Sequence, residues 1–222
     1  MNRAAAAPAG PRGVVFDLDG TLLDTWQIHE HCLREAVRDL GGSAVGRVRL
    51  WRAQRPTDLA TLGELIGAEH AEEALLSYRA ALARELTVRQ PRPVGGVEAV
   101  LVGLRSHGVP VGVCTGRSRE DAQTLLTAAR LDVPLVVARQ DAPPKPSPEA
   151  LLFALRRLSL EKQDALFVGD SEWDRAQGHA ACVRTLIVER AGLPAELAAA
   201  RWPPGTHPAA AAEDPSGTPI PQ

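Results

Sequence analysis

Two acidic segments hold the residues most able to do chemistry. Asp17 and Asp19 lie two residues apart, directly after the apolar run 14–16, and Asp170 and Asp174 lie four apart after the run 165–168. Like charges this close are unfavourable unless a cation or a positive partner compensates them. Asp170 and Asp174 span the start of a predicted helix, where both can point to one side, although acids also favour a helix start by themselves.

Two further segments offer groups that bind an anion. Thr115 and Gly116 follow the apolar run 109–114 and supply a hydroxyl and a flexible backbone. Lys145 is one of only two lysines and lies between prolines. An oxygen-rich cluster suits Mg²⁺, which prefers one or two carboxylates plus a substrate phosphate. A lysine and a hydroxyl can bind phosphate oxygens, one carboxylate can attack phosphorus, and a second can transfer protons.

A parallel sheet would bring these four segments together. Short apolar runs rich in Val and Leu predict buried strands at 14–16, 109–114, 135–137, 165–168 and 185–188. A helical pattern precedes each of the last four runs, at 97–107, 118–130, 147–158 and 172–182. This alternation predicts an α/β fold with a doubly wound, Rossmann-like parallel sheet. Ligands bind such sheets at the carboxyl ends of the strands, which is where the four polar segments lie.

The segment 25–92 interrupts this alternation, because it carries helical patterns only, at 26–40, 57–67 and 69–88. So long a segment is too much for a loop. We therefore expect an α/β core over 13–24 and 93–202, with an inserted all-helical cap over 25–92 and hinges at 20–24 and 91–93. The Pro- and Ala-rich ends, 1–12 and 203–222, are predicted to be disordered.

Composition excludes several classes of protein. The net charge of −2 and the pI of about 6.3 argue against a nucleic-acid binder. The three cysteines are widely spaced, which disfavours a zinc site or a disulfide framework and fits a reducing cytoplasm. The sequence has no signal-peptide pattern and no apolar stretch approaching the ~20 residues of a membrane span. A cytoplasmic protein without nucleic-acid or membrane partners is expected.

Together the four segments resemble the haloacid dehalogenase superfamily, in the phosphatase branch whose helical cap follows the first strand, the group of phosphoglycolate phosphatase and β-phosphoglucomutase. The resemblance rests on DLDGTLLDT at 17–25, CTGR at 114–117, PPKPSPEAL at 143–151 and FVGDSEWD at 167–174. It implies that Asp17 is the nucleophile and Asp19 the general acid/base, while Thr115 and Lys145 bind the phosphoryl group. It further implies that Mg²⁺ is held by Asp17, the backbone carbonyl of Asp19, Asp170 and, directly or indirectly, Asp174.

Other residues are expected to contact the substrate: Gly20, Thr21, Gly116, Arg117, His29 and Arg55. The Gly116-Arg117 pair is less usual in the family than Thr-Asn, so Arg117 either reaches the substrate or caps the next helix. A His also occupies the place of His29 in the β-phosphoglucomutase group. Arg55 either belongs to a solvated helix face or hangs over the crevice and binds an anionic part of the substrate. Cys182 stands where the family commonly has Gly.

These observations predict a Mg²⁺-dependent hydrolase that acts on a small phosphomonoester through an aspartyl-phosphate, as a monomer or homodimer. The cap would close over the crevice and set specificity. A phosphomutase on the same scaffold is the alternative that His29 and Arg55 motivate. A non-catalytic phosphate-binding protein of the same fold is the third.

Overall fold

A five-stranded sheet, in which every strand runs parallel to its neighbours, forms the centre of the core. The computed structural model describes residues 11–188, 192–194 and 197. The strand order is β5-β4-β1-β6-β7. The strands span Gly13–Phe16 (β1), Val111–Cys114 (β4), Leu135–Val137 (β5), Ala165–Gly169 (β6) and Arg184–Ile187 (β7). The predicted doubly wound α/β fold is confirmed, because the chain starts at the central strand and adds strands on both sides.

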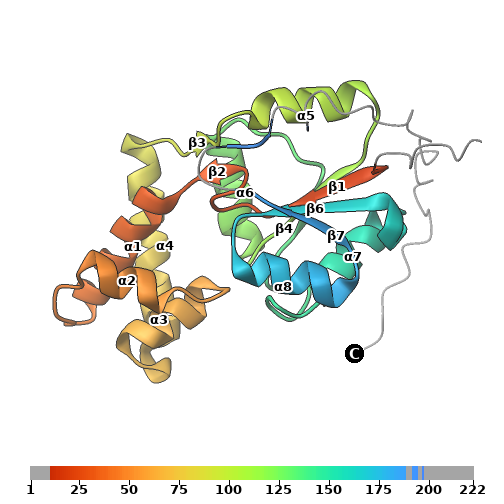
Figure 1. The fold of residues 1–222 in the computed structure, drawn as a ribbon. Coiled ribbons are helices and arrows are strands. Elements are labelled where there is room, and N and C mark those ends of the chain that lie inside the picture. The colour runs from red at the N-terminus through yellow and green to blue at the C-terminus, as the bar shows by residue number, and fades with distance from the viewer. Residues whose placement is uncertain (1–10, 189–191, 195–196, 198–222) are drawn as a thin grey trace, which may run out of the picture.

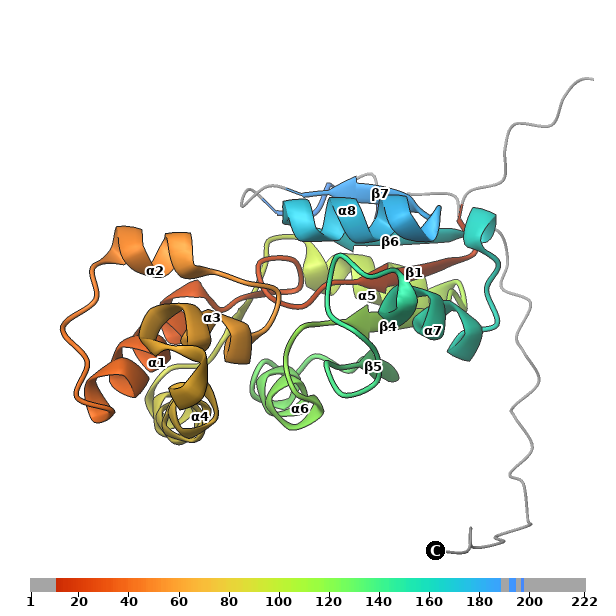
Figure 2. The ribbon, with the colours of Figure 1, turned by 90° about the horizontal axis from the view of Figure 1, so that it is seen from below.

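Helices cover both faces of this sheet (Figures 1 and 2). They span Val97–Ser106 (α5), Arg119–Ala128 (α6), Glu149–Arg157 (α7) and Glu172–Ala181 (α8). Alternate residues of β1 face opposite sides. Phe16 packs in one buried cluster with apolar residues of α5 and α6, whereas Val15 belongs to a second cluster with residues of α7 and α8. Both faces of the sheet are therefore covered, which explains why β1, β4 and β6 are apolar and buried. The edge strand β7 begins with Arg184 and Thr185 instead.

Side-chain caps fix where two of these helices begin. Ser118 accepts a hydrogen bond from the Asp121 N–H at the start of α6, as the sequence predicted. Ser171 and Asp174 form a reciprocal capping box at the start of α8. Both caps satisfy backbone N–H groups that the helix itself leaves without partners. At the other end of α8, Cys182 adopts the left-handed conformation, with φ of 56°.

The cap is all helical, as expected. Its helices span Trp26–Asp39 (α1), Arg47–Ala53 (α2), Asp58–Ile66 (α3) and Ala71–Val88 (α4), with a short 3-10 turn at Ala68–His70 (η1). A second 3-10 turn, Lys162–Asp164 (η2), lies in the core before β6. The chain enters and leaves the cap at the two predicted hinges. These segments lie side by side, because Leu23–Asp24 (β2) pairs antiparallel with Arg92–Pro93 (β3). The sequence did not predict this two-stranded pair.

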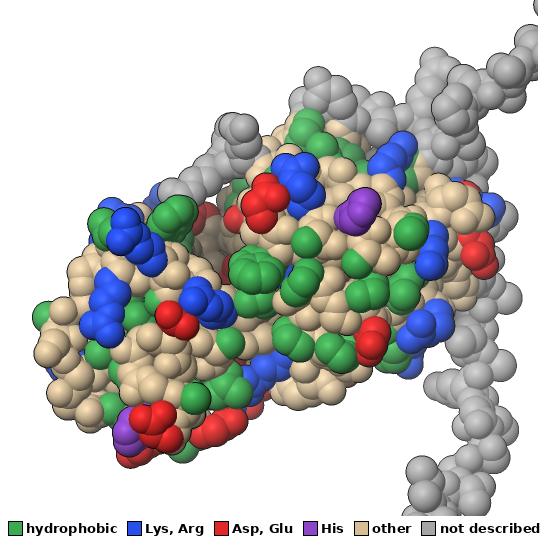
Figure 3. Space-filling model, turned by 60° about the horizontal axis from the view of Figure 1, so that its bottom comes forward, with side chains coloured by type: hydrophobic (Ala, Val, Ile, Leu, Met, Phe, Trp, Pro, Cys, Tyr) green, Lys and Arg blue, Asp and Glu red, His purple; other side chains and the backbone are tan. Residues whose placement is uncertain are grey.

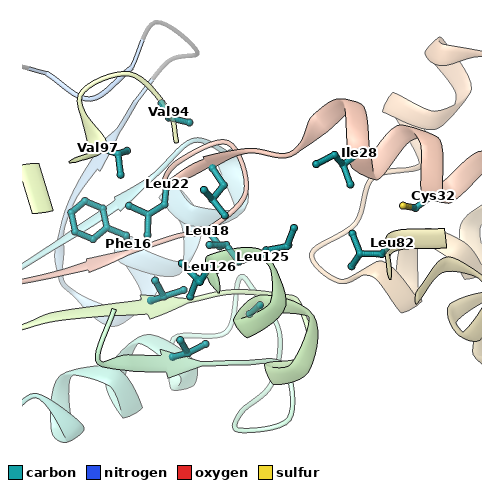
Figure 4. Packing of buried hydrophobic residues seen from close by; sticks show 14 of the residues in the cluster. Phe16, Leu18, Leu22, Ile28, Cys32, Leu82, Val94, Val97, Leu125 and Leu126 are labelled. Atoms are coloured by element: carbon teal, nitrogen blue, oxygen red, sulfur yellow. The ribbon is translucent and has the colours of Figure 1, made fainter. Parts of the chain in front are cut away.

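Apolar packing continues from the core towards the cap. One buried cluster contains both Phe16 and Leu22 of the core and Ile28 and Leu82 of the cap (Figure 4). An ion pair also joins the cap to the core: Nε of Arg79 on α4 lies 3.2 Å from Oδ2 of Asp121 on α6. The cap in this structure therefore rests against the core.

The two ends of the chain lie mostly outside the described residues. The predicted disordered tail 203–222 lies outside the described residues, as does most of the predicted disordered segment 1–12. Arg12 of that segment is described: its backbone N–H bonds to the carbonyl of Asp164 at 2.6 Å, which extends the pairing of β1 with β6. On the face shown in Figure 3, basic and acidic side chains are interspersed. None of the helices in the described part of the chain has the length and apolar character of a membrane span.

Candidate active site

The carboxyl ends of three adjacent strands meet at the floor of the site. Asp17 follows β1, Thr115 follows β4 and Asp170 follows β6, and β1 lies between the other two strands in the sheet. The Asp17 N–H bonds to the Val168 carbonyl at 2.8 Å, which extends the pairing of β1 with β6 up to Asp17. The sheet order alone therefore brings together segments that lie up to about 150 residues apart, as expected for ligand sites in parallel sheets.

Lys145 reaches this floor from the loop between β5 and α7. Its Nζ donates a hydrogen bond to Asp17 Oδ1 and lies 2.6 Å from Asp174 Oδ1. All three side chains are buried. Burial raises the pKa of Asp17 well above its ordinary value; Lys145 opposes that shift, and Asp174 and Asp170 add to it. Burial alone would lower the pKa of Lys145, but Asp17 and Asp174 outweigh it and the pKa is raised. Lys145 therefore stays cationic.

Three carboxylates form a potential metal site beside this lysine. Asp17, Asp170 and Asp174 each offer one oxygen, and these atoms lie within 4.8 Å of one another. Asp174 Oδ1 is fully enclosed and, apart from its ion pair with Lys145, has no hydrogen-bond partner among the described residues. Burial and the charge of Asp174 raise the pKa of Asp170 to about 6. The donor set fits a divalent cation, because hard cations take carboxylate oxygens and excess negative charge disfavours the ion-free state.

Local backbone structure positions these carboxylates. Ser171 donates to Asp174 Oδ2 from its N–H at 3.1 Å and from its hydroxyl at 2.5 Å. That leaves Asp174 Oδ1 for Lys145 or a cation. Gly20 has φ of +80°, and a Cβ there would lie 1.9 Å from Asp170 Oδ2. Glycine is therefore required at this position both for the turn and for the close approach of Asp170.

Asp19 lies outside the carboxylate cluster and is bound by Arg117 instead. The guanidinium donates from Nε to Asp19 Oδ2 at 2.7 Å and from Nη2 to Oδ1 at 2.8 Å. The Thr25 hydroxyl also donates to Oδ1, at 2.5 Å. Burial would raise the pKa of Asp19, but the charge and hydrogen bonds of Arg117 outweigh it, and the pKa is lowered. The carboxylate of Asp19 is not part of the cluster formed by Asp17, Asp170 and Asp174, and a metal contact of its backbone carbonyl stays a prediction.

The other end of Arg117 contacts the cap. Its Nη1 donates to Tyr78 Oη at 2.8 Å and lies 3.5 Å from Asp58 Oδ2. His29 Nδ1 lies 2.8 Å from the same Tyr78 oxygen, and its Nε2 lies 3.1 Å from Gln54 Oε1. Burial lowers the pKa of His29, so the imidazole is neutral at pH 7. This polar network joins the cap to Asp19.

The remaining predicted residues divide between the site and its surroundings. Thr115 is buried and its hydroxyl accepts the Arg117 N–H at 3.2 Å. A Cβ on Gly116 would lie 1.7 Å from the Pro56 carbonyl, so a cap segment closes against this glycine. Thr21 Oγ1 is buried without a partner among the described residues. Arg55 is committed to the cap, because its Nη2 pairs with Glu64 at 2.9 Å, and its contact with substrate stays a prediction.

Sequence analysis missed the cap residues of this network, Tyr78, Asp58 and Gln54. Tyr78 is the only tyrosine in the chain and is completely buried, and a buried hydroxyl usually has a partner. That signal could have singled it out. Burial raises the pKa of the Cys114 thiol to about 12. Its side chain therefore stays a thiol, which is a poor nucleophile.

Comparison with known proteins identifies the family. Residues 14–188 match the family described as haloacid dehalogenase-like hydrolase. The chain belongs to this family. Phosphoglycolate phosphatase 1 of Pseudomonas aeruginosa is 32% identical over 186 residues, covering 78% of this chain and 68% of that protein. Phosphoglycolate phosphatase of Rhodospirillum rubrum is also 32% identical, over 80% of this chain and 79% of the other. These relatives and the family make the chain an enzyme of the phosphatase type.

A solved structure shares the fold of this haloacid dehalogenase-like hydrolase. CbbY from Rhodobacter sphaeroides, in complex with phosphate, has a TM-score of 0.72 at 19% sequence identity and covers 81% of this chain and 86% of its own. The shared fold supports the arrangement of core and cap described above. The non-catalytic alternative is set aside, because the chain is a phosphatase-type enzyme by family.

Proposed function

We propose that this hydrolase cleaves a small phosphomonoester in a Mg²⁺-dependent reaction through an aspartyl-phosphate on Asp17. The observation that carries the proposal is the contact of one buried lysine, Lys145, with the carboxylates of Asp17 and Asp174, next to Asp170. Such a centre can accept the negative charge of a phosphoryl group while keeping a carboxylate nucleophile in place.

In the proposed reaction, Asp17 attacks phosphorus. Lys145 binds its Oδ1, which leaves the other oxygen to form the bond. The bond from phosphorus to the leaving oxygen breaks and its electron pair goes to that oxygen. Asp19, which takes up a proton from solvent once Arg117 releases one of its oxygens, donates that proton to give the alcohol. Water then cleaves the acyl phosphate with Asp19 as the base, which releases phosphate and restores Asp17. Lys145 and the Thr115 hydroxyl hold the phosphoryl oxygens through both steps.

Asp17, Asp170 and Asp174 would hold the cation, together with the Asp19 carbonyl if the family resemblance extends to it. Mg²⁺ bound there would offset the carboxylate charge and polarise the phosphoryl oxygens. The raised pKa of Asp17 and Asp170 supports this, because closely spaced carboxylates that resist ionisation gain most from a cation.

The substrate is proposed to be a small phosphorylated metabolite with an alkyl leaving group. Relatives named phosphoglycolate phosphatase make phosphoglycolate the first compound to test. The phosphomutase alternative receives no added support, because both ring nitrogens of His29 contact cap side chains and Arg55 pairs with Glu64. In this arrangement His29 is bound within the cap, and Arg55 is held in an exposed ion pair.

Phosphate release tests this function. Phosphoglycolate, other phosphorylated metabolites and p-nitrophenyl phosphate are incubated with the enzyme in the presence of Mg²⁺ or EDTA. We expect release that requires both Mg²⁺ and the Asp17 carboxylate, with Asp17→Asn as the inactive control. Release that persists in EDTA or in Asp17→Asn would contradict the proposed mechanism. Isomerised sugar phosphate without net phosphate release would instead favour the mutase.

A further inference from the structure

One buried guanidinium connects the general acid/base position to the cap. Arg117 is only 3% exposed. One edge of its guanidinium binds both oxygens of Asp19 at 2.7 and 2.8 Å. Its remaining nitrogen, Nη1, donates to Tyr78 Oη on α4 at 2.8 Å and lies 3.5 Å from Asp58 on α3. A single side chain therefore contacts the segment after β1 and two helices of the cap.

In this arrangement Arg117 and Thr25 hold the Asp19 carboxylate in a fixed orientation. Both of its oxygens are bound by Arg117, and Thr25 donates a third hydrogen bond to one of them. The proposed reaction requires one Asp19 oxygen to contact the oxygen of the departing alcohol, within hydrogen-bonding distance. Exchange of at least one Arg117 bond would let the carboxylate turn towards the alcohol and take up the proton that the alcohol needs.

We propose that Arg117 is a positioning residue that makes the access of Asp19 to the leaving group depend on the position of the cap. With the cap closed and no substrate bound, the fork of Arg117 holds Asp19 against the cap residues Tyr78 and Asp58. A bound phosphomonoester brings negative charge that competes for the guanidinium and frees one Asp19 oxygen towards the leaving group. The inference rests on the proposed phosphatase function and deepens it.

Arginine is the side chain that this arrangement needs. A planar guanidinium can bind a carboxylate through two parallel hydrogen bonds and still donate from its outer nitrogen, whereas an ammonium is a single point of charge. The backbone supports the placement, because the Arg117 N–H bonds to the hydroxyl of Thr115, the residue expected to bind the phosphoryl group. The guanidinium thus lies on the segment that the substrate phosphate approaches.

The test compares two leaving groups through kcat/KM, which reports the steps up to alcohol release. An alkyl alcohol needs a proton as it leaves, whereas p-nitrophenolate leaves without one. The substrates are p-nitrophenyl phosphate and the alkyl phosphomonoester that the wild-type enzyme hydrolyses fastest. For Arg117→Gln we expect kcat/KM for the alkyl ester to fall roughly tenfold more than for p-nitrophenyl phosphate, because Asp19 loses the remaining Arg117 bond that orients it. This is less than the roughly 10²–10⁴-fold effect of a general acid itself, because Asp19 is still present. Tyr78→Phe, which removes only the contact in the cap, is expected to change the ratio in the same direction by less.

Two further variants separate positioning from structure. Arg117→Lys keeps the charge without the fork, so we expect it to leave the ratio of the two substrates altered. Arg79→Gln breaks the other ion pair between cap and core, with Asp121, and is expected to leave the ratio at its wild-type value. Thermal unfolding of each variant identifies any that fails to fold, and Tyr78→Phe carries the test if Arg117→Gln is such a variant.

Each outcome decides between the proposals. Equal losses on both substrates in Arg117→Gln and Tyr78→Phe, full rescue by Arg117→Lys, or the same altered ratio in Arg79→Gln would overturn the positioning role while leaving the phosphatase function intact. A wild-type enzyme that releases phosphate from neither substrate would contradict the proposed function itself.

Discussion

Replacing Lys145 by methionine should lower the free energy of unfolding, because the carboxylates of Asp17 and Asp174 lose their positive partner. Methionine keeps an unbranched stem of similar length, so packing changes little, while the charge that faces Asp17 and Asp174 is lost. Removing one partner of a buried ion pair costs about 3–5 kcal/mol, because the other charge stays buried without compensation. Since native proteins have roughly 5–15 kcal/mol of stability, the variant is expected to fold but to unfold at much lower denaturant concentration.

The loss should depend on pH in a defined direction. Burial already raises the pKa of Asp17, and removal of Lys145 raises it further. An acid whose pKa is higher in the folded than in the unfolded state stabilises the fold most at low pH, and that stability declines as pH rises towards the folded pKa. The cost of Lys145→Met in metal-free protein should therefore be smaller at about pH 5 than at about pH 8.

Urea unfolding at the two pH values measures this effect. Lys162→Met is the matched control, because Lys162 is the only other lysine and is exposed, and it should change the free energy of unfolding by no more than about 0.5 kcal/mol. A Lys145→Met cost below about 1 kcal/mol at the higher pH, or an equal cost at both, would refute the reasoning. Mg²⁺ should restore part of the lost stability, because it supplies positive charge to the same carboxylates.

Three further predictions follow from single residues. Cys182→Gly should stabilise the protein by about 0.5–1 kcal/mol in denaturant unfolding. The left-handed conformation of Cys182 costs a non-glycine residue about 1–2 kcal/mol, and the greater freedom of glycine in the unfolded chain offsets part of that gain. Cys182→Ala should show no such gain. Mg²⁺ affinity, measured by calorimetry, should increase as pH rises through about 6, where Asp170 loses its proton and becomes a ligand; an affinity that does not change across that range would argue against Asp170 as a ligand. Gly116→Ala should lower kcat/KM because its Cβ would overlap the Pro56 carbonyl, whereas Gly46→Ala, in open space, should not; equal effects would argue against closure of the cap on Gly116.

Much of the core could be predicted from sequence because its signals are local. Apolar runs with glycine or polar ends marked all five strands of the sheet to within about two residues, and the alternation with helices fixed their parallel direction. The placement of Asp17, Thr115 and Asp170 at one edge followed from that direction alone. The capping role of Ser118 was visible from its spacing to Asp121.

The rest depended on how the cap docks against the core. The β2–β3 pair has two residues in each strand, too few for a periodic pattern. Tyr78 and Arg117 lie 39 residues apart and on different subdomains, so no spacing in the sequence relates them. For Arg117 the sequence left two roles open, substrate contact or helix capping, and the structure adds a third: its side chain binds Asp19.

The central claim is that Asp17 carries the phosphoryl group. The most direct measurement is the mass of enzyme quenched in acid during turnover of p-nitrophenyl phosphate with Mg²⁺, followed by mapping of any added phosphoryl group to a peptide. We expect one phosphoryl group on the peptide that contains Asp17. A larger fraction of the enzyme should carry it in Asp19→Asn, where the second step lacks its base, and none should carry it in Asp17→Asn. Turnover without any phosphorylated enzyme in Asp19→Asn, or a phosphoryl group retained in Asp17→Asn, would contradict it.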